Sequence, residues 1–277
     1  MITGTTRLIA HLGFPTEAFK APMIYNPWFE QQGIDAVVVP MGVRPDDYPA
    51  TLAALARITN LHGALVTMPH KVTTLALVDE ATPTARIAGA CNALLKRPDG
   101  TWLGDQFDGA GFVRGIAGKQ RRIAGAHVFI AGSGGVGSAI AASFAAAGVA
   151  ALDLFDVHAA SAEALRARLL QHYPTLAVRA GRDDPAGHEI VVNATPLGMA
   201  AADPLPFDVA RVDAGALVGE VVMKAEHTPL LRAALARGLE VQVGTDMLFE
   251  MIPAYLEFFG FGSATPDALR AVARIRY

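Results

Sequence analysis

The sequence predicts an α/β protein built around a mostly parallel β-sheet. Short β-branched runs, typical of buried parallel strands, alternate with Ala- and Leu-rich stretches of helical length. The strand-like runs are residues 36–39, 126–130, 190–192, 216–218 and 240–243, and the helical stretches include 49–58, 138–147 and 160–172. This alternation indicates helices packed on a sheet whose strands run in the same direction.

Length and composition limit the classes of protein that fit. The chain has 277 residues, 52% of them hydrophobic, which is enough for one large domain or two ordinary ones. A net charge of −3 gives no reason to expect nucleic acid or an anionic membrane as partner. No apolar run approaches the roughly 20 residues that span a bilayer, and the N-terminus lacks a secretory segment. We therefore expect a soluble cytoplasmic protein.

The number and spacing of the cysteine and histidine residues predict no metal site. Cys91 is the single cysteine, which excludes an intramolecular disulfide and a Cys-based zinc cluster. The eight histidines have no metal-binding spacing. We interpret Cys91 as a small buried hydrophobic residue and His70 as a packing residue.

A domain boundary is expected near residue 115, where a basic, glycine-containing run precedes the clearest strand–loop–helix unit. The domains are then 1–114 and 115–245. An apolar helical stretch follows Gly244, and a final helix begins after Thr265, a plausible N-cap, with Pro266 at its first position. Periodicity alone does not decide which domain these helices join.

The strongest local signal is a glycine-rich loop between a strand and an Ala-rich helix. Gly132, Gly134 and Gly137 form G-x-G-x-x-G. The first permits a tight turn, the second lets the backbone approach a pyrophosphate, and the third lets helix pack on strand. The helix N-terminus also favours phosphate. The loop predicts a Rossmann-type dinucleotide site that includes Ser133, Gly135 and Val136; the alternative is a glycine-rich turn without nucleotide.

The residue that ends the next strand predicts the kind of dinucleotide. Asp156 lies 19 residues after Gly137. A carboxylate there accepts hydrogen bonds from both ribose hydroxyls and repels a 2′-phosphate. No arginine follows immediately, since the next residues are Val157 and His158. We therefore expect NAD rather than NADP, with His158 also at the cofactor site.

Six segments, in order, resemble the shikimate/quinate dehydrogenase family. They are GALVTMPHK (63–71), GACNA (89–93), GDQFDG (104–109), NATPLGM (193–199), HTPLL (227–231) and GTDML (244–248). The resemblance covers nearly the whole chain. It implies an N-terminal α/β substrate domain followed by a Rossmann-type domain, with residues 246–277 completing the first.

The resemblance also assigns roles to individual residues. Lys71 matches the catalytic lysine and Asp108 its partner aspartate. Oxidation of a secondary alcohol requires its hydroxyl proton to leave, and a lysine held by a carboxylate can accept or relay that proton. Thr67 and Asn92 match positions that bind substrate hydroxyls. Further cofactor contacts are expected at Asn193, Ala194, Thr195, Leu197, Val221, Met223 and Gly244.

The departures from the family pattern concentrate where a substrate carboxylate would bind. The two serines of S-x-S-P are replaced by Phe19 and Ala21, and other polar positions have become Leu65, Phe107, Met223 and Met251. Each lost charge-assisted hydrogen bond is worth roughly 1.5–3 kcal/mol, so losing two lowers affinity by a factor on the order of 10² to 10⁴. Lys20 or Tyr25 could supply a replacement, although the favoured interpretation of Lys20 is a lysine that faces solvent. Lys20 and Met251 remain candidate substrate contacts.

Together these patterns predict an NAD-dependent dehydrogenase acting reversibly on a ring alcohol such as shikimate, quinate or a close analogue. One alternative is a dehydrogenase of a less polar cyclic alcohol, which the apolar replacements would fit. The other is a non-catalytic NAD(H)-binding sensor, against which the retained Lys71 and Asp108 argue. The sequence leaves the oligomeric state open, with a homodimer as one option.

Overall fold

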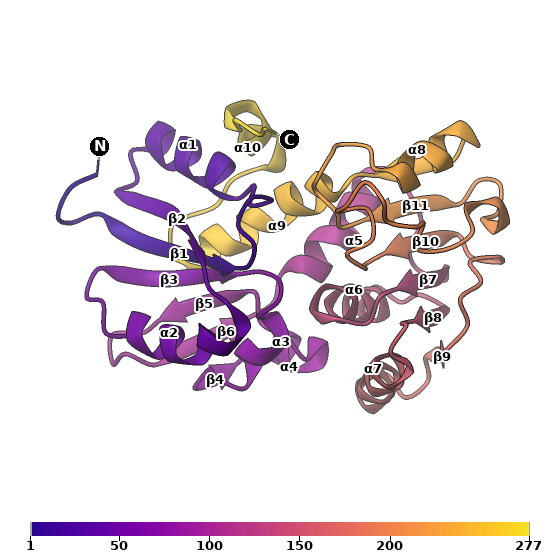
Figure 1. Ribbon diagram of the computed structural model, residues 1–277, viewed down its shortest axis with the longest axis horizontal. Helices are drawn as coiled ribbons and strands as arrows, with labels where there is room; N and C mark the ends of the chain where they lie inside the picture. The colour runs from indigo at the N-terminus through magenta and orange to yellow at the C-terminus, as the bar shows by residue number, and fades with distance from the viewer. Residues whose placement is uncertain (1, 277) are drawn as a thin grey trace. The chain divides into compact units, whose positions relative to one another are not determined.

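The computed structural model describes residues 2–276 and contains two compact units (Figure 1). The first unit extends to Phe107 and takes up the chain again over Met251–Arg276. The second unit is Asp108–Glu250. Both are layered arrangements of helices on a six-stranded sheet, which confirms the predicted α/β class.

The transition between the units differs in detail from the expected boundary. The first part of the basic run, up to Gly118, lies inside helix α5 (Asp108–Gly118), which buries Phe112 and Ile116, and the remainder of the run follows the helix. Gly115 and Gly118 therefore belong to a helix, whereas Gly125 lies in the turn before β7. The chain leaves the first unit at the start of α5.

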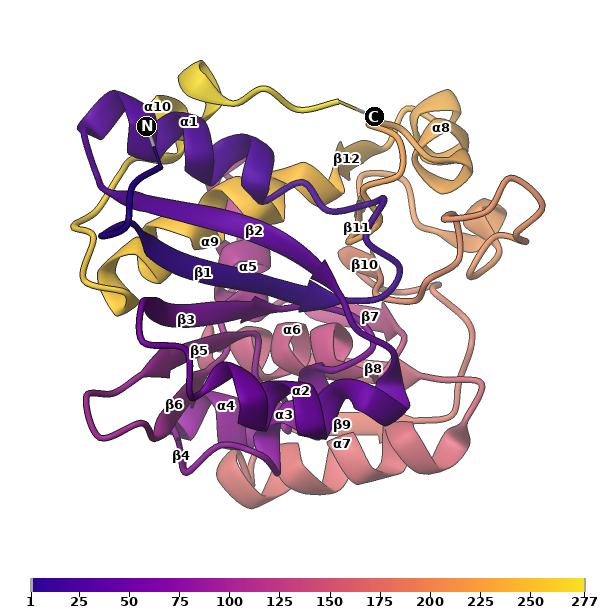
Figure 2. The same cartoon turned by 60° about the vertical axis from the view of Figure 1, so that its left-hand side comes forward.

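The sheet of the first unit is mixed, with strand order β2-β1-β3-β5-β6-β4. β1 pairs in parallel with both β2 and β3, between which it lies (Figure 2), and β5 and β6 are antiparallel additions beside β3. The bounds are β1 Arg7–Gly13, β2 Ala36–Gly42, β3 Leu61–Val66, β4 Glu80–Ala81, β5 Ala93–Lys96 and β6 Trp102–Asp105. Only β2 was indicated by the sequence patterns, because the other strands are short or contain Gly, His and charged residues.

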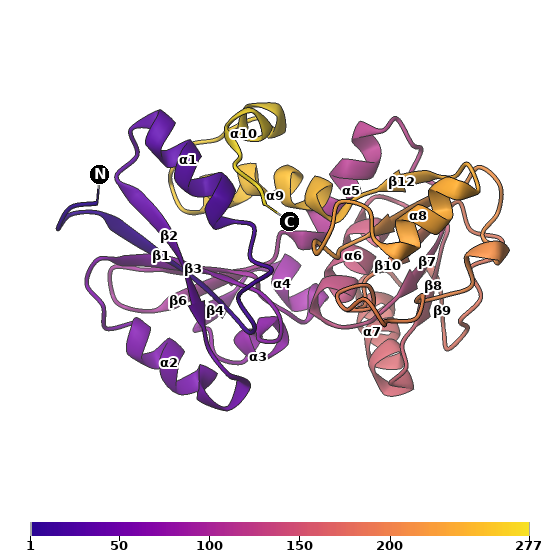
Figure 3. The same ribbon diagram turned by 45° about the horizontal axis from the view of Figure 1, so that its top comes forward.

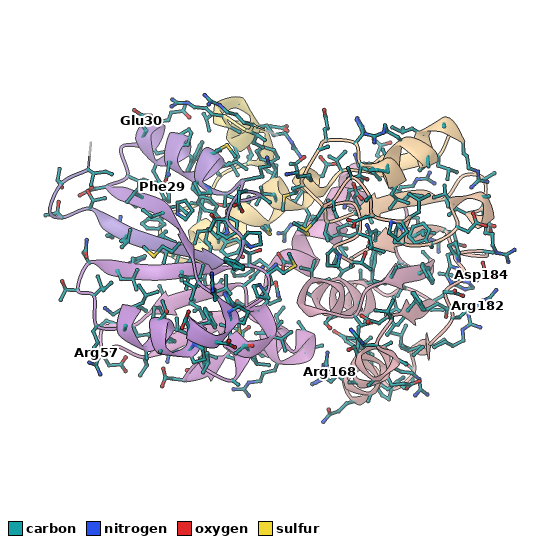
Figure 4. All side chains as sticks on the ribbon, in the orientation of Figure 1. Phe29, Glu30, Arg57, Arg168, Arg182 and Asp184 are labelled. Carbon is teal, nitrogen blue, oxygen red and sulfur yellow. The ribbon has the colours of Figure 1, made fainter. Side chains whose placement is uncertain are left out.

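Helices cover both faces of this sheet. α1, α9 and α10 lie on one side and α2, α3 and α4 on the other (Figure 1). Phe29 turns to the buried side of α1 and Glu30 to solvent (Figure 4), and the Phe29 ring packs on that of Phe261. The bounds are α1 Pro22–Gln32, α2 Tyr48–Leu55, α3 Lys71–Leu75, α4 Pro83–Ala88, α9 Gly244–Phe258 and α10 Pro266–Val272.

The C-terminal segment is tied to the N-terminal part of the chain. The Thr265 hydroxyl accepts a hydrogen bond from the Ala268 amide, and Pro266 begins α10, as the sequence predicted. Beyond α10, the Arg274 amide donates to the Met23 carbonyl of α1 over 2.9 Å. The last part of the chain therefore completes the first unit.

The sheet of the second unit is entirely parallel, in the order β12-β11-β10-β7-β8-β9. The chain starts at the central β7, moves outward to β8 and β9, and then returns to the other side of β7. This is the doubly wound Rossmann order, in which ligands bind at the carboxyl edge where the winding reverses. The bounds are β7 His127–Ala131, β8 Ala151–Phe155, β9 Ala177–Ala180, β10 Ile190–Asn193, β11 Leu217–Glu220 and β12 Glu240–Gln242.

Three connections of the second unit contain an α-helix, whereas β9 is followed by β10 without one. α6 (Gly135–Ala146) connects β7 to β8, α7 (Ala159–His172) connects β8 to β9, and α8 (Pro229–Ala236) connects β11 to β12, beside which it lies (Figure 3). The core strands expose almost nothing, because both faces of a parallel sheet are covered. Within residues 2–276, no helix combines the length and apolar character needed to cross a membrane.

Candidate active site and cofactor-binding loop

The glycine loop joins β7 to α6 at the carboxyl edge of the second sheet. Gly132 has φ +100°, and a Cβ there would lie 2.7 Å from the backbone of Ala194. A Cβ on Gly137 would lie 1.9 Å from the Gly132 carbonyl oxygen, whereas one on Gly134 would meet nothing within 4 Å. Packing within the protein therefore requires two of the glycines. Gly134, the N-cap residue of α6, leaves open space beside a helix N-terminus, as a bound pyrophosphate would need.

Asp156 lies directly against this loop. One carboxylate oxygen accepts a hydrogen bond from the Ser133 amide over 2.7 Å, and the other accepts one from the His158 amide over 2.8 Å. The carboxylate is thus fixed at the end of β8, beside the glycine loop. The lone pairs left on its oxygens can still accept bonds from ribose hydroxyls.

The loop after β10 is held by the Asn193 side chain. Its Oδ1 accepts from the amide and hydroxyl of Thr195, and its Nδ2 donates to the Leu197 carbonyl. The Cβ of Ala194 lies against the glycine loop, 3.3 Å from where a Cβ on Gly137 would stand. The two predicted cofactor loops are therefore in direct contact.

The remaining predicted cofactor residues gather at the same edge. The Val221 amide donates to the Asn193 carbonyl over 3.2 Å. A Cβ on Gly244 would lie 2.4 Å from the Val222 carbonyl oxygen and 3.0 Å from Cγ of Met223. Val221, Met223 and Gly244 thus lie together after β11 and β12.

Sequence reasoning missed Glu220, the last residue of β11. Glu220 is fully buried and pairs in register with Asn193. Burial raises its pKa to about 7, and the nearby Thr228 and Asn193 side chains lower it only in part. Neither carboxylate oxygen makes a well-formed hydrogen bond with the described residues. A carboxylate ending an apolar strand was a signal that could have identified it.

Replacing Glu220 with glutamine should change how stability depends on pH. The pKa of Glu220 is 4.5 in the unfolded chain and about 7 in the folded protein. Its contribution to the free energy of unfolding is therefore fully present below pH 4.5 and is lost as the pH rises through 7. The stability of the variant relative to the wild type should therefore rise by about 2 kcal/mol between pH 5 and pH 8. Chemical denaturation at the two pH values measures this, with Glu163→Gln on the exposed side of α7 as control. Parallel pH profiles for wild type and Glu220→Gln would contradict the assignment.

Three predicted site residues of the first unit come together around the start of α3. Lys71 begins α3, and its carbonyl accepts a hydrogen bond from the Cys91 amide over 2.9 Å, which places Asn92 beside it. Asn92 is buried, and its Oδ1 accepts from the Phe107 amide. The Thr67 carbonyl accepts a hydrogen bond from the His70 amide, next to Lys71, and the Val66 amide donates to the Asn92 carbonyl. Thr67, Lys71 and Asn92 therefore lie in one neighbourhood.

Two of the three remaining candidates lie on α5 and α9. Asp108 is the first residue of α5 and is 1% exposed. Met251 is buried on α9, one helical turn before Tyr255, whose hydroxyl donates to the Asn92 carbonyl. Met251 is thus on the helix that packs against the Asn92 segment.

The solvent-facing interpretation of Lys20 is wrong, because its side chain is only 5% exposed. The Lys20 ammonium donates to the carbonyl of Arg276 in the C-terminal segment. A contact between residues 256 positions apart was invisible to sequence reasoning. Tyr25 is also buried, which raises the pKa of its hydroxyl well above the usual value.

Cys91 and His70 have the structural roles that were expected. Burial raises the pKa of the Cys91 thiol to about 12, so it stays protonated and unreactive. His70 stacks on Tyr48 with ring centroids 4.0 Å apart, and its Nε2 contacts the Val43 carbonyl. No cluster of metal-ligating side chains occurs in the part of the chain that the structure describes.

Comparison with known proteins gives matches over the whole chain. The family profile described as shikimate dehydrogenase substrate binding domain matches residues 12–94, and that of the ThiF family matches residues 110–174. A shikimate dehydrogenase (NADP(+)) of Acidiphilium cryptum is 37% identical over 99% of this chain and 98% of its own length.

Solved structures match over a similar share of the chain. A quinate dehydrogenase from Corynebacterium glutamicum in complex with NAD is 28% identical, with a TM-score of 0.84 and coverage of 96% of this chain and 98% of that one. A shikimate 5-dehydrogenase from Listeria monocytogenes in complex with shikimate and NAD is 25% identical, with a TM-score of 0.85 and coverage of 98% and 97%.

A Rossmann-type unit with full-length relatives named as dehydrogenases makes this protein an oxidoreductase that uses a nicotinamide dinucleotide. The identity over nearly the entire length allows a narrower statement. The chain belongs to the shikimate dehydrogenase family.

Proposed function

We propose that this protein oxidises a ring secondary alcohol reversibly, with shikimate, quinate or a close analogue as substrate and NAD as cofactor. In this proposal the second unit binds the dinucleotide and the first binds the ring. The observation that carries it is the neighbourhood of Thr67, Lys71 and Asn92, a cation beside neutral hydrogen-bonding groups that suit a hydroxylated ring.

The residues of the chain have separate tasks in this reaction. A bound nicotinamide dinucleotide would supply the acceptor for the hydride of the alcohol carbon. Lys71 takes or relays the hydroxyl proton, and Asp108 is its partner carboxylate. Thr67 and Asn92 orient the ring through its hydroxyls. The open space at Gly134 and the helix N-terminus of α6 accommodate the pyrophosphate.

The choice of NAD rests on Asp156 and contrasts with the names of relatives that use NADP(+). The Asp156 carboxylate is held against the glycine loop by the Ser133 and His158 amides. A fixed negative charge at this position favours the free ribose hydroxyls of NAD and opposes a 2′-phosphate.

The direct test is the initial rate of NAD⁺ and NADP⁺ reduction with shikimate and with quinate over a wide concentration range. An NAD⁺-dependent rate with a high KM is expected, because Phe19 and Ala21 offer no hydroxyl to a substrate carboxylate. Clear NAD⁺ binding without turnover of either acid would favour a less polar cyclic alcohol as substrate.

Replacing Asp156 with asparagine should reduce the preference for NAD⁺ over NADP⁺. Asparagine keeps an acceptor oxygen for the Ser133 or His158 amide but removes the charge, so the fold of the loop should persist. We expect the ratio of the two kcat/KM values to move toward NADP⁺ by about 10- to 100-fold, or about 1.4–2.8 kcal/mol. Asp156→Ser, which loses both the negative charge and the carboxyl acceptor oxygens, is the comparison. An unchanged ratio in the asparagine variant would locate the selectivity elsewhere.

A further inference from the structure

Buried polar atoms without a hydrogen-bond partner occur in the first unit, close to the residues proposed to bind substrate. Among the described residues they include Nδ1 of His11, the hydroxyl of Tyr25 and Nδ2 of Asn92. Native proteins rarely leave such atoms unpaired, so each calls for an explanation. One common explanation in functional sites is that a bound ligand supplies the missing hydrogen-bond partner.

His11 and Asn92 both lie beside Lys71. The Thr67 amide donates to the carbonyl of Leu12, the residue after His11, and the His70 amide donates to the Thr67 carbonyl. His11 therefore lies near the start of α3, where the charge of Lys71 acts on its ring. The Cys91 amide donates to the Lys71 carbonyl, which fixes Asn92 next to α3. His11 is on β1, paired in register with Leu65 of β3, so the two side chains share a face of the sheet. The His11 imidazole therefore lies next to Leu65, one of the positions where this chain has an apolar residue in place of the polar one of the family pattern.

The His11 ring is held in place and uncharged. It stacks on the Phe19 ring with centroids 4.1 Å apart. Burial, and secondarily the charge of Lys71, lower its pKa to about 3. A neutral imidazole offers one N–H donor and one lone pair, which matches a hydroxyl group and provides no charge for a carboxylate.

We propose that His11 is a substrate-specificity residue that binds a neutral ring hydroxyl neighbouring the hydroxyl that reacts at Lys71. The two hydroxyls are then vicinal, and Nδ2 of Asn92, which the family resemblance already assigns to substrate hydroxyls, has no hydrogen-bond partner among the described residues. This inference rests on the proposed function, because it places the reacting alcohol at Lys71. It assigns recognition to a residue outside the motifs that identified the family.

The test is His11→Phe, which keeps a ring stacked on Phe19 and removes both nitrogens. The probes are shikimate and cis-1,2-cyclohexanediol, with cyclohexanol as the ring that lacks a second hydroxyl. kcat/KM for the two vicinal diols should fall about 10- to 100-fold, mainly through KM, while the cofactor Kd stays unchanged. His11→Asn, which restores a neutral donor and acceptor, should recover part of the loss. His62→Phe, a histidine of the same unit beside Phe259 and Phe261, is the matched control.

Calorimetric binding of the same probes to the cofactor-saturated protein separates this inference from the proposed function. Turnover of diols that is equal in wild type and His11→Phe would overturn the role of His11 and leave the function standing. Binding that depends on His11 without turnover would support the role of His11 and overturn the function. If wild type neither binds nor oxidises any probe, both proposals fail.

Discussion

Replacement of Lys71 with alanine should lower turnover by a factor of about 10² to 10⁴, the range typical of a lost acid–base group. The reason is that the hydroxyl proton must leave as hydride departs from the same carbon. No other ammonium is proposed for this step, since Lys20 is engaged with the Arg276 carbonyl. The measurement is kcat and KM for the best ring alcohol at saturating cofactor.

The loss at Lys71 should be confined to chemistry. The cofactor is proposed to bind the second unit, so its Kd should be unchanged in Lys71→Ala. Lys96→Ala is the control, because the Lys96 ammonium contacts the Ile58 carbonyl away from α3. A Lys71→Ala variant that kept most of its rate would show that the proton leaves by another route. Reduced cofactor binding would instead indicate a structural role.

The second large effect is expected in the glycine loop, where two alanine substitutions should fail for different reasons. A methyl group on Gly134 meets no atom of the protein within 4 Å, and the φ of −71° suits alanine. Gly134→Ala should therefore fold with an unchanged melting temperature but bind NAD⁺ about 10- to 100-fold more weakly, because the methyl stands where pyrophosphate approaches. Gly137→Ala should lose both binding and stability, since its Cβ would lie 1.9 Å from the Gly132 carbonyl oxygen.

Thermal unfolding and calorimetric titration with NAD⁺ distinguish the two glycine variants. Gly4→Ala serves as control, because its Cβ also meets nothing within 4 Å and the residue is outside the loop. Normal NAD⁺ affinity in Gly134→Ala would mean that the open space at the start of α6 does not hold the dinucleotide. Normal stability in Gly137→Ala would mean that the contact between glycine loop and helix is not rigid.

The sequence by itself determined the features that depend on neighbours along the chain. The strand, glycine loop and helix around Gly132 could be predicted, because the whole G-x-G-x-x-G pattern lies in one continuous stretch of the chain between a strand and a helix. The same holds for the N-cap at Thr265 and for the alternation that indicated an α/β class. Ordered motifs over nearly the whole length also identified the family, although the roles of Lys71 and Asp108 stay predictions.

Only the tertiary structure decided which residues meet. The antiparallel β5 and β6 are too short to show a pattern, and their place beside β3 depends on pairing between distant segments. Glu220 became a candidate because register places it opposite Asn193 in a buried sheet. Lys20 is buried by the far end of the chain, and His11 stands beside Lys71 through the packing of the first unit. Burial and charge at a site are sums over such long-range contacts, which local residue patterns do not encode.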